Sequence, residues 1–282
     1  MNQTPIIGKV IIAGAGPGAP ELITVKLMEA LGIADVIITD RLVNPTIIER
    51  YASKKAILIL AGKQGYTTAS ISQCKLSELI IQHALKGQNV LRLKGGDVAL
   101  FSNVLEELNA LRQHQIPYEI IPGITAASGA SAYTGIPLTA RGYAQGAQFL
   151  TFQHNDFDIP ERWKNITRSS ETLVFYMAAQ HLVQVARQLL FYGTKPSTAI
   201  AVIEQATTMY QQVHISTLER CENEWAAKPF SSPSLVIVGD VVQRNSCPVA
   251  IIGSIPLNRF VKRGLFLCSD QYARRRSTTG AC

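Results

Sequence analysis

The first half of the chain alternates short apolar runs with longer amphipathic segments, which predicts strands followed by helices. The apolar runs include residues 10–13, 36–39 and 57–60, which consist almost entirely of Val, Ile and Leu. Strands of this kind are typical of a parallel sheet that is covered on both faces. We therefore expect an α/β domain with a parallel sheet and helices between its strands, the last helix at residues 126–135.

The pattern changes near residues 142–146, beyond which strands predominate. We expect several of these strands to be antiparallel, with one clear helix among them at residues 180–193. The chain is thus predicted to form two α/β domains, over residues 1–143 and 144–243. A basic tail over residues 244–282 has no sustained period, and we expect it to be poorly ordered.

Composition agrees with a globular protein that has a sizeable core, since 47% of the residues are hydrophobic and 17% are charged. There is no apolar run long enough to span a membrane, and the first residues lack the pattern of a signal peptide. The five cysteines are scattered, without a C-x-x-C pair, which argues against a disulfide framework and against a zinc site. We expect a cytoplasmic protein with no membrane association and no bound metal.

The net charge of +7 is concentrated near the end of the chain. Seven basic residues and one acidic residue follow Val241, so nearly all the excess charge lies there. A basic segment of this kind is either a surface for nucleic acid or a solvated tail. We expect the solvated tail, and no nucleic-acid partner.

Three glycine-rich turns follow predicted strands, at residues 14–18, 95–97 and 122–126. Ligands of open α/β sheets bind beyond the carboxyl ends of the strands, and glycine lets the backbone approach a ligand closely. Asp97 could hold a hydroxyl or an amino group there, and Thr125 offers a hydroxyl. The chain has no G-x-x-x-x-G-K-[ST] motif, so these turns favour a small ligand with amino and ribose groups over a triphosphate.

The first turn also matches a dinucleotide fingerprint loosely, through Gly14, Gly16 and Ala19, with Asp40 at the end of the next strand. Pro17 weakens this match, because proline removes an amide that would face a pyrophosphate. A tight turn without a ligand and an NAD-dependent dehydrogenase are the alternatives. The second glycine site argues against the dehydrogenase.

Longer segments resemble uroporphyrinogen-III C-methyltransferases, which are members of the tetrapyrrole methylase family. The resemblance covers roughly residues 7–243 and rests on D-R-L-V at 40–43, R-L-K-G-G-D at 92–97 and G-I-P-L-T at 135–139. It implies two α/β domains with the active-site cleft between them, and a homodimer. The implied reaction uses S-adenosyl-L-methionine, which becomes S-adenosyl-L-homocysteine. Two ring carbons of uroporphyrinogen III are methylated to give precorrin-2, for sirohaem or cobalamin synthesis.

The resemblance also assigns roles to particular residues. Asp40 and Lys63 match a proton acceptor and a proton donor; the alternatives are a partner for Arg41 and an exposed loop lysine. The resemblance assigns the contacts to S-adenosylmethionine to nine residues. Without the resemblance, the sequence pattern would predict Met177 and Ala206 to be core residues. The nine are Pro17, Gly95, Gly96, Asp97, Leu100, Thr125, Ala126, Met177 and Ala206.

A tetrapyrrole edged with carboxylates needs cations in its pocket, because arginine pairs with carboxylates in a bidentate manner. The candidates are Arg41, Arg92, Lys94 and Arg141. Arg92 and Lys94 lie on a strand that the pattern predicts to be buried, so a structural ion pair is the alternative for both. His154 keeps the histidine of a family T-G-H segment.

The chain departs from the family pattern on the side that would face the tetrapyrrole. Asn103 stands where the family has an arginine, flanked by Ser102 and Val104 in place of glycines, and Ala140 replaces a histidine. These changes leave the cofactor residues intact and bear on the substrate. A methyltransferase of a later precorrin, and a non-catalytic relative that binds S-adenosylmethionine or a tetrapyrrole, are therefore the alternative functions.

Overall fold

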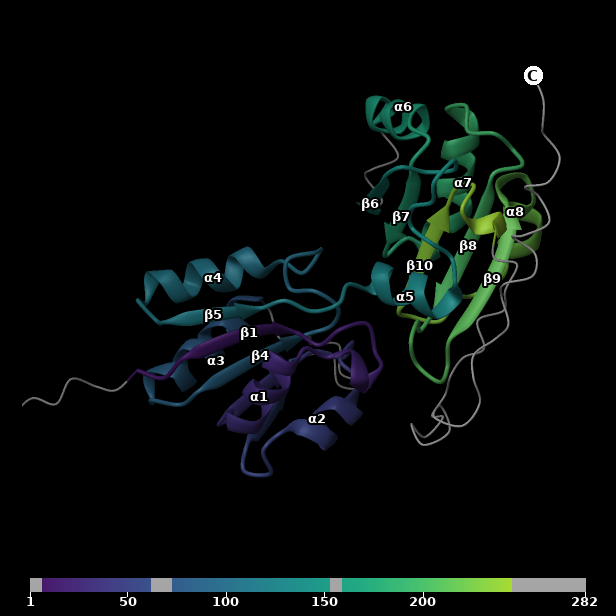
Figure 1. Ribbon diagram of the computed structural model, residues 1–282. Coiled ribbons are helices and arrows are strands. Elements are labelled where there is room, and N and C mark those ends of the chain that lie inside the picture. The colour runs from purple at the N-terminus through teal and green to yellow at the C-terminus, as the bar shows by residue number, and fades with distance from the viewer. Residues whose placement is uncertain (1–6, 62–72, 153–158, 245–282) are drawn as a thin grey trace, which may run out of the picture. The chain divides into compact units, whose positions relative to one another are not determined.

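The computed structural model describes residues 7–61, 73–152 and 159–244, so Lys63 and His154 lie outside the described residues. The described residues all belong to one compact unit, Met1–Val249. They form two five-stranded sheets with helices against them (Figure 1).

The first sheet is entirely parallel, as the apolar runs predicted, with strand order β3-β2-β4-β1-β5. The central strands β1, β2 and β4 are completely buried, which explains their near-continuous apolar sequence. The parallel arrangement brings the carboxyl ends of all five strands to one edge of the sheet. The five strands are β1 (Val10–Gly14), β2 (Val36–Thr39), β3 (Ile57–Leu60), β4 (Val90–Lys94) and β5 (Tyr118–Ile121).

Helices cover both faces of this sheet, because successive side chains of a strand point to opposite sides. Val10 and Ile12 pack with α3 and α4, whereas Ile11 and Ala13 pack with α1 and α2. In Figure 1, α4 accordingly lies on the opposite side of the sheet from α1 and α2. The four helices are α1 (Val25–Ile33), α2 (Pro45–Tyr51), α3 (Gln73–Leu85) and α4 (Val104–Gln113).

The second sheet is mixed, with strand order β6-β7-β10-β8-β9. Strands β6 and β7 are parallel, and the other neighbours are antiparallel, which confirms the expectation for this half of the chain. Its strands are β6 (Ala147–Thr151), β7 (Thr172–Tyr176), β8 (Ala199–Glu204), β9 (Gln212–Thr217) and β10 (Ser234–Val238).

Helices α6 (Pro160–Arg168), α7 (Leu182–Phe191) and α8 (Leu218–Trp225) pack on one face of the second sheet. Helix α5 (Ala126–Thr134) packs on the other face, where its small residues allow close contact with β8 and β10. The sequence places α5 before the predicted boundary at residue 143, yet its apolar contacts are with the second sheet. The position of that boundary stays a prediction.

Helices α2, α6 and α8 are absent from the sequence-based prediction. Their length of seven to nine residues does not explain this by itself, because α1 and α5, with nine residues each, were predicted; α2 and α6 bury only one and two residues. Helix α2, for example, buries Ile47 alone. Within the described residues, no helix has both the length and the apolar character that crossing a bilayer requires.

Candidate active site at the glycine-rich turns

The three glycine-rich turns meet at the carboxyl edge of the first sheet. Gly16 and Gly96 exchange two backbone hydrogen bonds, of 3.1 and 2.8 Å, which join the first turn to the second. The third turn is equally close, since a Cβ built on Gly123 would lie 2.2 Å from the carbonyl oxygen of Gly96. Any side chain at Gly123 would therefore push the turns apart. The glycine at this position is required by backbone packing.

Asp97 links the second and third turns through its carboxylate. One oxygen accepts a hydrogen bond from the Ala99 amide at 2.8 Å, and the other accepts one from the Gly123 amide at 2.9 Å. The sequence predicted Asp97 as a ligand group, and the structure gives it this structural role. Each carboxylate oxygen has a second lone pair, so Asp97 can hold the turns and still accept a hydrogen bond from a ligand.

Open space adjoins the second turn. Gly96 has a φ of +67°, and a Cβ placed on it would have no neighbour nearer than the Ala126 amide nitrogen at 3.9 Å. Gly95, Gly96, Thr125 and Ala126 are all partly exposed. A ligand can therefore approach this turn closely, although the amide and carbonyl groups of Gly96 are already bonded to Gly16.

Tyr176, at the end of β7, contributes a side chain from the second sheet. Its hydroxyl lies 2.6 Å from the hydroxyl of Thr125 and accepts a hydrogen bond from the Ala127 amide at 3.1 Å. Its ring packs against Phe101 with a centroid distance of 5.0 Å. Burial raises the pKa of Tyr176, and the nearby charge of Asp97 acts in the same direction, although the two hydrogen bonds oppose them. The phenol therefore stays protonated and can donate to Thr125.

The first turn lies against two further segments. A Cβ on Gly129 of α5 would lie 2.5 Å from Pro17, and a Cβ on Gly18 would lie 3.2 Å from the carbonyl oxygen of Ala206. Met177 follows Tyr176 with a φ of +58°. The predicted cofactor contacts are thus carried by three turns of the first sheet and by the segments that follow β7 and β8. All nine are partly exposed or exposed: Pro17, Gly95, Gly96, Asp97, Leu100, Thr125, Ala126, Met177 and Ala206.

Asp40 follows β2 at the same edge of the sheet and is partly buried. One of its oxygens accepts a hydrogen bond from the Leu42 amide at 3.0 Å, which fixes the carboxylate against the turn. Its other oxygen lies 3.9 Å from a guanidinium nitrogen of Arg92. Asp40 is therefore held in place beside a buried cation, whereas the exposed Arg41 makes no ion pair with a described residue.

Arg92 and Lys94, predicted to bind substrate, point into the core between β4 and α4. They are only 4% and 6% exposed, and both contact the same carboxylate oxygen of Glu107, at 3.4 and 3.0 Å. Gln73 donates to that oxygen as well, at 3.2 Å. The other oxygen of Glu107 is buried and has no hydrogen-bond partner among the described residues. The contacts thus agree with the structural ion pair considered for both cations.

Among the substituted family positions, Asn103 lies at the surface, whereas Ser102, Val104 and Ala140 are partly buried. Asn103 is exposed and precedes α4 with a φ of +52°, a backbone conformation that asparagine tolerates better than most residues. Ala140 forms an isolated bridge with Ala144. Arg141 is exposed and makes no ion pair with a described residue. Of the four predicted substrate cations, Arg41 and Arg141 are therefore free to meet an external carboxylate.

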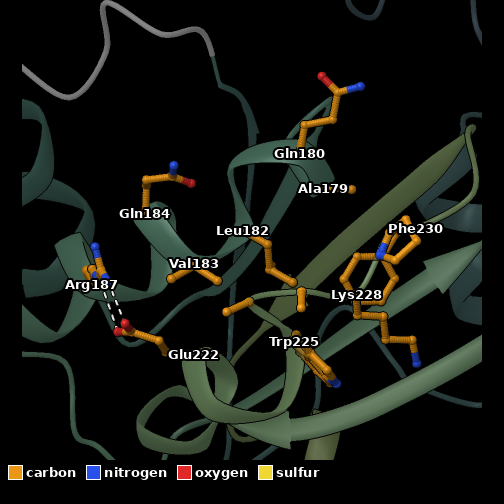
Figure 2. Close-up of a pocket in the computed structure, with 13 residues that line it drawn as sticks. Ala179, Gln180, Leu182, Val183, Gln184, Arg187, Glu222, Trp225, Lys228 and Phe230 are labelled. Carbon is orange, nitrogen blue, oxygen red and sulfur yellow. Dashed lines mark hydrogen bonds and ion pairs between the residues drawn. The ribbon is translucent and has the colours of Figure 1, made fainter.

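A separate cavity of about 730 Å³ lies on the face of the second sheet that carries α7 and α8 (Figure 2). Trp225 and Phe230 line it in an edge-to-face contact, and the ion pair of Arg187 with Glu222 closes one side. As far as the described residues define its lining, it includes none of the predicted cofactor, catalytic or substrate residues. Arg187 and Glu222 are paired with each other, and Lys228 contacts His214. No predicted site residue among the described ones is involved, so this cavity is not the candidate site.

Several residues that hold the site together could not be found from the sequence. Tyr176 lies in an apolar strand and resembles a core residue there. Glu107 follows another glutamate in an amphipathic helix, so nothing in the pattern separates the buried one from the exposed one. Thr207 and Gln211, in the turn after β8, could not be found either, because neither the positive φ of Thr207 nor the side-chain hydrogen bonds of Gln211 are visible in a sequence.

The parallel sheet with its converging strand-end turns, joined to a second mixed sheet, defines an α/β protein whose candidate ligand site lies at the carboxyl ends of its strands. The chain belongs to the tetrapyrrole (corrin/porphyrin) methylase family, whose profile matches residues 9–222.

Relatives and solved structures agree with this assignment. The chain is 40% identical over 236 residues to a siroheme synthase of Nitrosomonas europaea, covering 84% of this chain and 49% of the relative. A siroheme synthase of Pseudomonas paraeruginosa is 41% identical, over 84% of this chain and 50% of that protein. The chain thus spans about half the length of the curated relatives that it matches.

A uroporphyrin-III C-methyltransferase of Thermus thermophilus, solved in complex with S-adenosylhomocysteine, superposes with a TM-score of 0.69. It is 32% identical, and the match covers 84% of this chain and 99% of that one. A cobalt precorrin-4 methyltransferase superposes with a TM-score of 0.74 at 22% identity, over 83% of this chain and 95% of that one, which shows a common fold.

Proposed function

We propose that the protein is an S-adenosylmethionine-dependent C-methyltransferase that converts uroporphyrinogen III to precorrin-2 by two successive methylations. The observation that carries this proposal is the convergence of the three glycine-rich turns with the segments after β7 and β8. The Thermus enzyme of the same fold, 32% identical, was solved with the product form of this cofactor. The product would enter sirohaem or cobalamin synthesis. A homodimer and a cytoplasmic location stay predictions.

The residues at the turns fit such a cofactor. Gly95, Gly96 and Ala126 are partly exposed, so a ligand can approach them closely, and the free lone pairs of Asp97 can accept hydrogen bonds from hydroxyl or amino groups. Thr125 can accept or donate beside them. When bound, S-adenosylmethionine supplies an electrophilic methyl group for transfer to a ring carbon. The protein's main contribution is to hold the two reactants in line, which is worth up to ~7–11 kcal/mol.

Asp40 is the residue that we expect to accept the proton which the ring releases after methylation. Its carboxylate is already oriented by the Leu42 amide and by Arg92, so little reorganisation is needed. General base catalysis of this kind contributes typically ~10²–10⁴-fold. Lys63, proposed as the proton donor, lies outside the described residues.

Arg41 and Arg141 are the cations that we propose for the carboxylates of the substrate, since both are exposed and lack an ion pair with a described residue. Arg92 and Lys94 contribute in another way. Their charges meet Glu107 inside the protein, and Arg92 extends from there toward Asp40. Arg92 would thus act on the catalytic carboxylate and Lys94 on Glu107, and neither on the substrate directly.

The test is an anaerobic incubation of the purified full-length protein with S-adenosylmethionine and uroporphyrinogen III, read by mass spectrometry over time. We expect one methyl addition and then a second. The matched control is Asp40→Asn, which should bind S-adenosylhomocysteine but form little product. Transfer to a later precorrin with none to uroporphyrinogen III would reject the proposed substrate. Binding of S-adenosylhomocysteine without any methylated product would indicate a non-catalytic relative.

A further inference from the structure

The turn after β8 contains a residue in an unfavourable backbone conformation. Thr207 has a φ of +68° and is only 5% exposed. A β-branched residue with positive φ is a genuine outlier, because its Cβ substituents collide with the backbone. Such strain persists only where surrounding contacts enforce it, and it is concentrated at functional sites.

Gln211 provides the contact that enforces this conformation. Its side-chain oxygen accepts a hydrogen bond from the Thr207 amide at 2.7 Å, and its side-chain nitrogen donates to the carbonyl oxygen of Tyr133 at 3.2 Å. Gln211 is itself 9% exposed; its bond with the Thr207 amide is buried and its bond with Tyr133 is partly buried. The turn is closed further by the Thr208 amide, which donates to the carbonyl oxygen of Gln205 at 3.1 Å. The amide side chain of Gln211 thus ties the turn to α5.

The hydroxyl of Thr207 reaches the first glycine-rich turn. It accepts a buried hydrogen bond of 3.0 Å from the amide of Ala19, which directly follows Pro17 and Gly18. Ala19 is 6% exposed, so its amide would have no water to replace that partner. On the other side of Thr207 lies Ala206. One hydroxyl therefore joins two of the segments that carry predicted cofactor contacts.

We propose that Thr207 and Gln211 are positioning residues for the cofactor. Gln211 holds Thr207 in the left-handed conformation, and the hydroxyl of Thr207 fixes the distance between the segments of Pro17 and Ala206. Neither residue is assigned a contact with the cofactor. The inference rests on the proposed function, because it assumes that S-adenosylmethionine binds between these segments.

This arrangement has a consequence that a purely structural role would not have. Losing the hydroxyl or the amide side chain should change the affinity for the cofactor in protein that is still folded. The rate of methyl transfer from the fully loaded enzyme should change less, since Asp40 and the second turn keep their own contacts. We therefore expect a higher KM for S-adenosylmethionine with a smaller change in kcat.

The experiment measures binding of S-adenosylhomocysteine by isothermal titration calorimetry, with the melting temperature recorded for every variant. Thr207→Val keeps the shape and the β-branch but loses the acceptor, whereas Thr207→Ser keeps the hydroxyl. Gln211→Met keeps the volume but loses both hydrogen bonds. Gln212→Met is its matched control, because Gln212 is the exposed neighbour at the start of β9.

We expect Thr207→Val and Gln211→Met to raise the Kd by about tenfold or more, because each removes at least one buried hydrogen bond that holds the two segments in place. Thr207→Ser and Gln212→Met should stay near the wild-type value. Lower melting temperatures with an unchanged Kd would overturn the inference and leave the proposed function standing. The inference would also be overturned, with the proposed function left standing, if Thr207→Ser weakened binding as much as Thr207→Val. A wild-type protein that does not bind S-adenosylhomocysteine would overturn both.

Discussion

At the scale of single residues, Asp40 is the side chain on which the proposed chemistry depends most. Asp40→Asn keeps the size and the hydrogen bond from the Leu42 amide but loses the charge that accepts a proton. We expect kcat to fall by ~10²–10⁴-fold. The Kd for S-adenosylhomocysteine should be unchanged, because Asp40 is not a predicted cofactor contact. Stopped-flow or discontinuous mass-spectrometric assays would measure the rate, with Asp240→Asn, at an exposed position after β10, as the control.

Glu204 is a second residue whose charge matters, in this case for stability. One of its oxygens accepts a hydrogen bond of 2.9 Å from the His214 ring, and the other accepts one of 2.9 Å from the Ser231 amide. Burial acts to raise its pKa, but the hydrogen bonds from Ser231 and His214 outweigh that effect and lower the pKa below its ordinary value of 4.5. The folded state therefore favours the charged carboxylate.

A carboxyl group with a lowered pKa stabilises the fold above its unfolded pKa and loses that contribution as the pH falls through the folded pKa. Glu204→Gln should thus lower the free energy of unfolding by ~1–3 kcal/mol at pH 7. The difference from the wild type should shrink below about pH 4.5. Urea denaturation at pH 7 and at a pH below about 4.5 measures this difference in the free energy of unfolding. Glu219→Gln, at an exposed position, is the control. A difference that stayed constant with pH would show that the charge of Glu204 is not responsible.

Prediction of single residues from the sequence succeeded where the residue type itself indicates the backbone geometry, as glycine does. The glycines at the three turns predict that backbone segments approach one another closely there. The structure places Gly16, Gly96 and Gly123 together at the sheet edge. Such prediction could not succeed for Thr207, because a threonine with positive φ looks like any other threonine. The roles of the nine proposed cofactor residues stay predictions.

At the scale of elements, β4 and α4 are joined by a buried group of charges. Glu107 on α4 meets Arg92 and Lys94 on β4, so its one negative charge lies between two cations inside the first sheet's core. A buried ion pair adds little net stability, but the removal of one partner leaves the other charge uncompensated. The connection between the strand and the helix therefore depends on Glu107.

Glu107→Gln should lower the free energy of unfolding by ~3–5 kcal/mol, the usual cost of breaking a buried pair. Glu106→Gln is a close control, because Glu106 is the exposed neighbour on the same helix and should change stability by less than ~0.5 kcal/mol. Chemical denaturation monitored by circular dichroism compares the two. Equal effects of the two substitutions would mean that the buried cations find another counter-charge when Glu107 is neutral.

The elements that the sequence predicted are those in which one physical signal is strong. The buried parallel strands follow from continuous Val, Ile and Leu, and α5 and α7 were expected where they occur. Helices α6 and α8 depend on tertiary contacts of a few large residues, such as Trp163 and Trp225. The buried residues of both helices do recur at helical spacing, which the sequence-based prediction missed. The packing partner of α5 is set by tertiary contacts with the second sheet.

At the scale of the whole molecule, the two sheets make unequal contributions to the proposed site. The first sheet supplies Asp40 and three turns, since all its strands run parallel and end at one edge. The mixed second sheet supplies the ends of β7 and β8, with Tyr176 and Thr207 making the hydrogen bonds to the first sheet's turns. The family's pattern of motifs thus corresponds to strand ends that are far apart in the sequence and joined by a few buried bonds.

Among the described residues, these contacts and the apolar clusters of both sheets involve no position beyond Val242. In addition, 99% of the Thermus structure is matched by 84% of this chain. A protein ending at Val249 should therefore keep the melting temperature of the full-length chain within about 3 °C, which corresponds to less than ~1 kcal/mol for a protein of this size. Its Kd for S-adenosylhomocysteine should also be unchanged. Calorimetry on both forms measures the two quantities under one set of salt conditions, because the truncation also removes basic residues.

A lower melting temperature would mean that residues 250–282 pack on the fold. Weaker binding at an unchanged melting temperature would place them at the cofactor site instead.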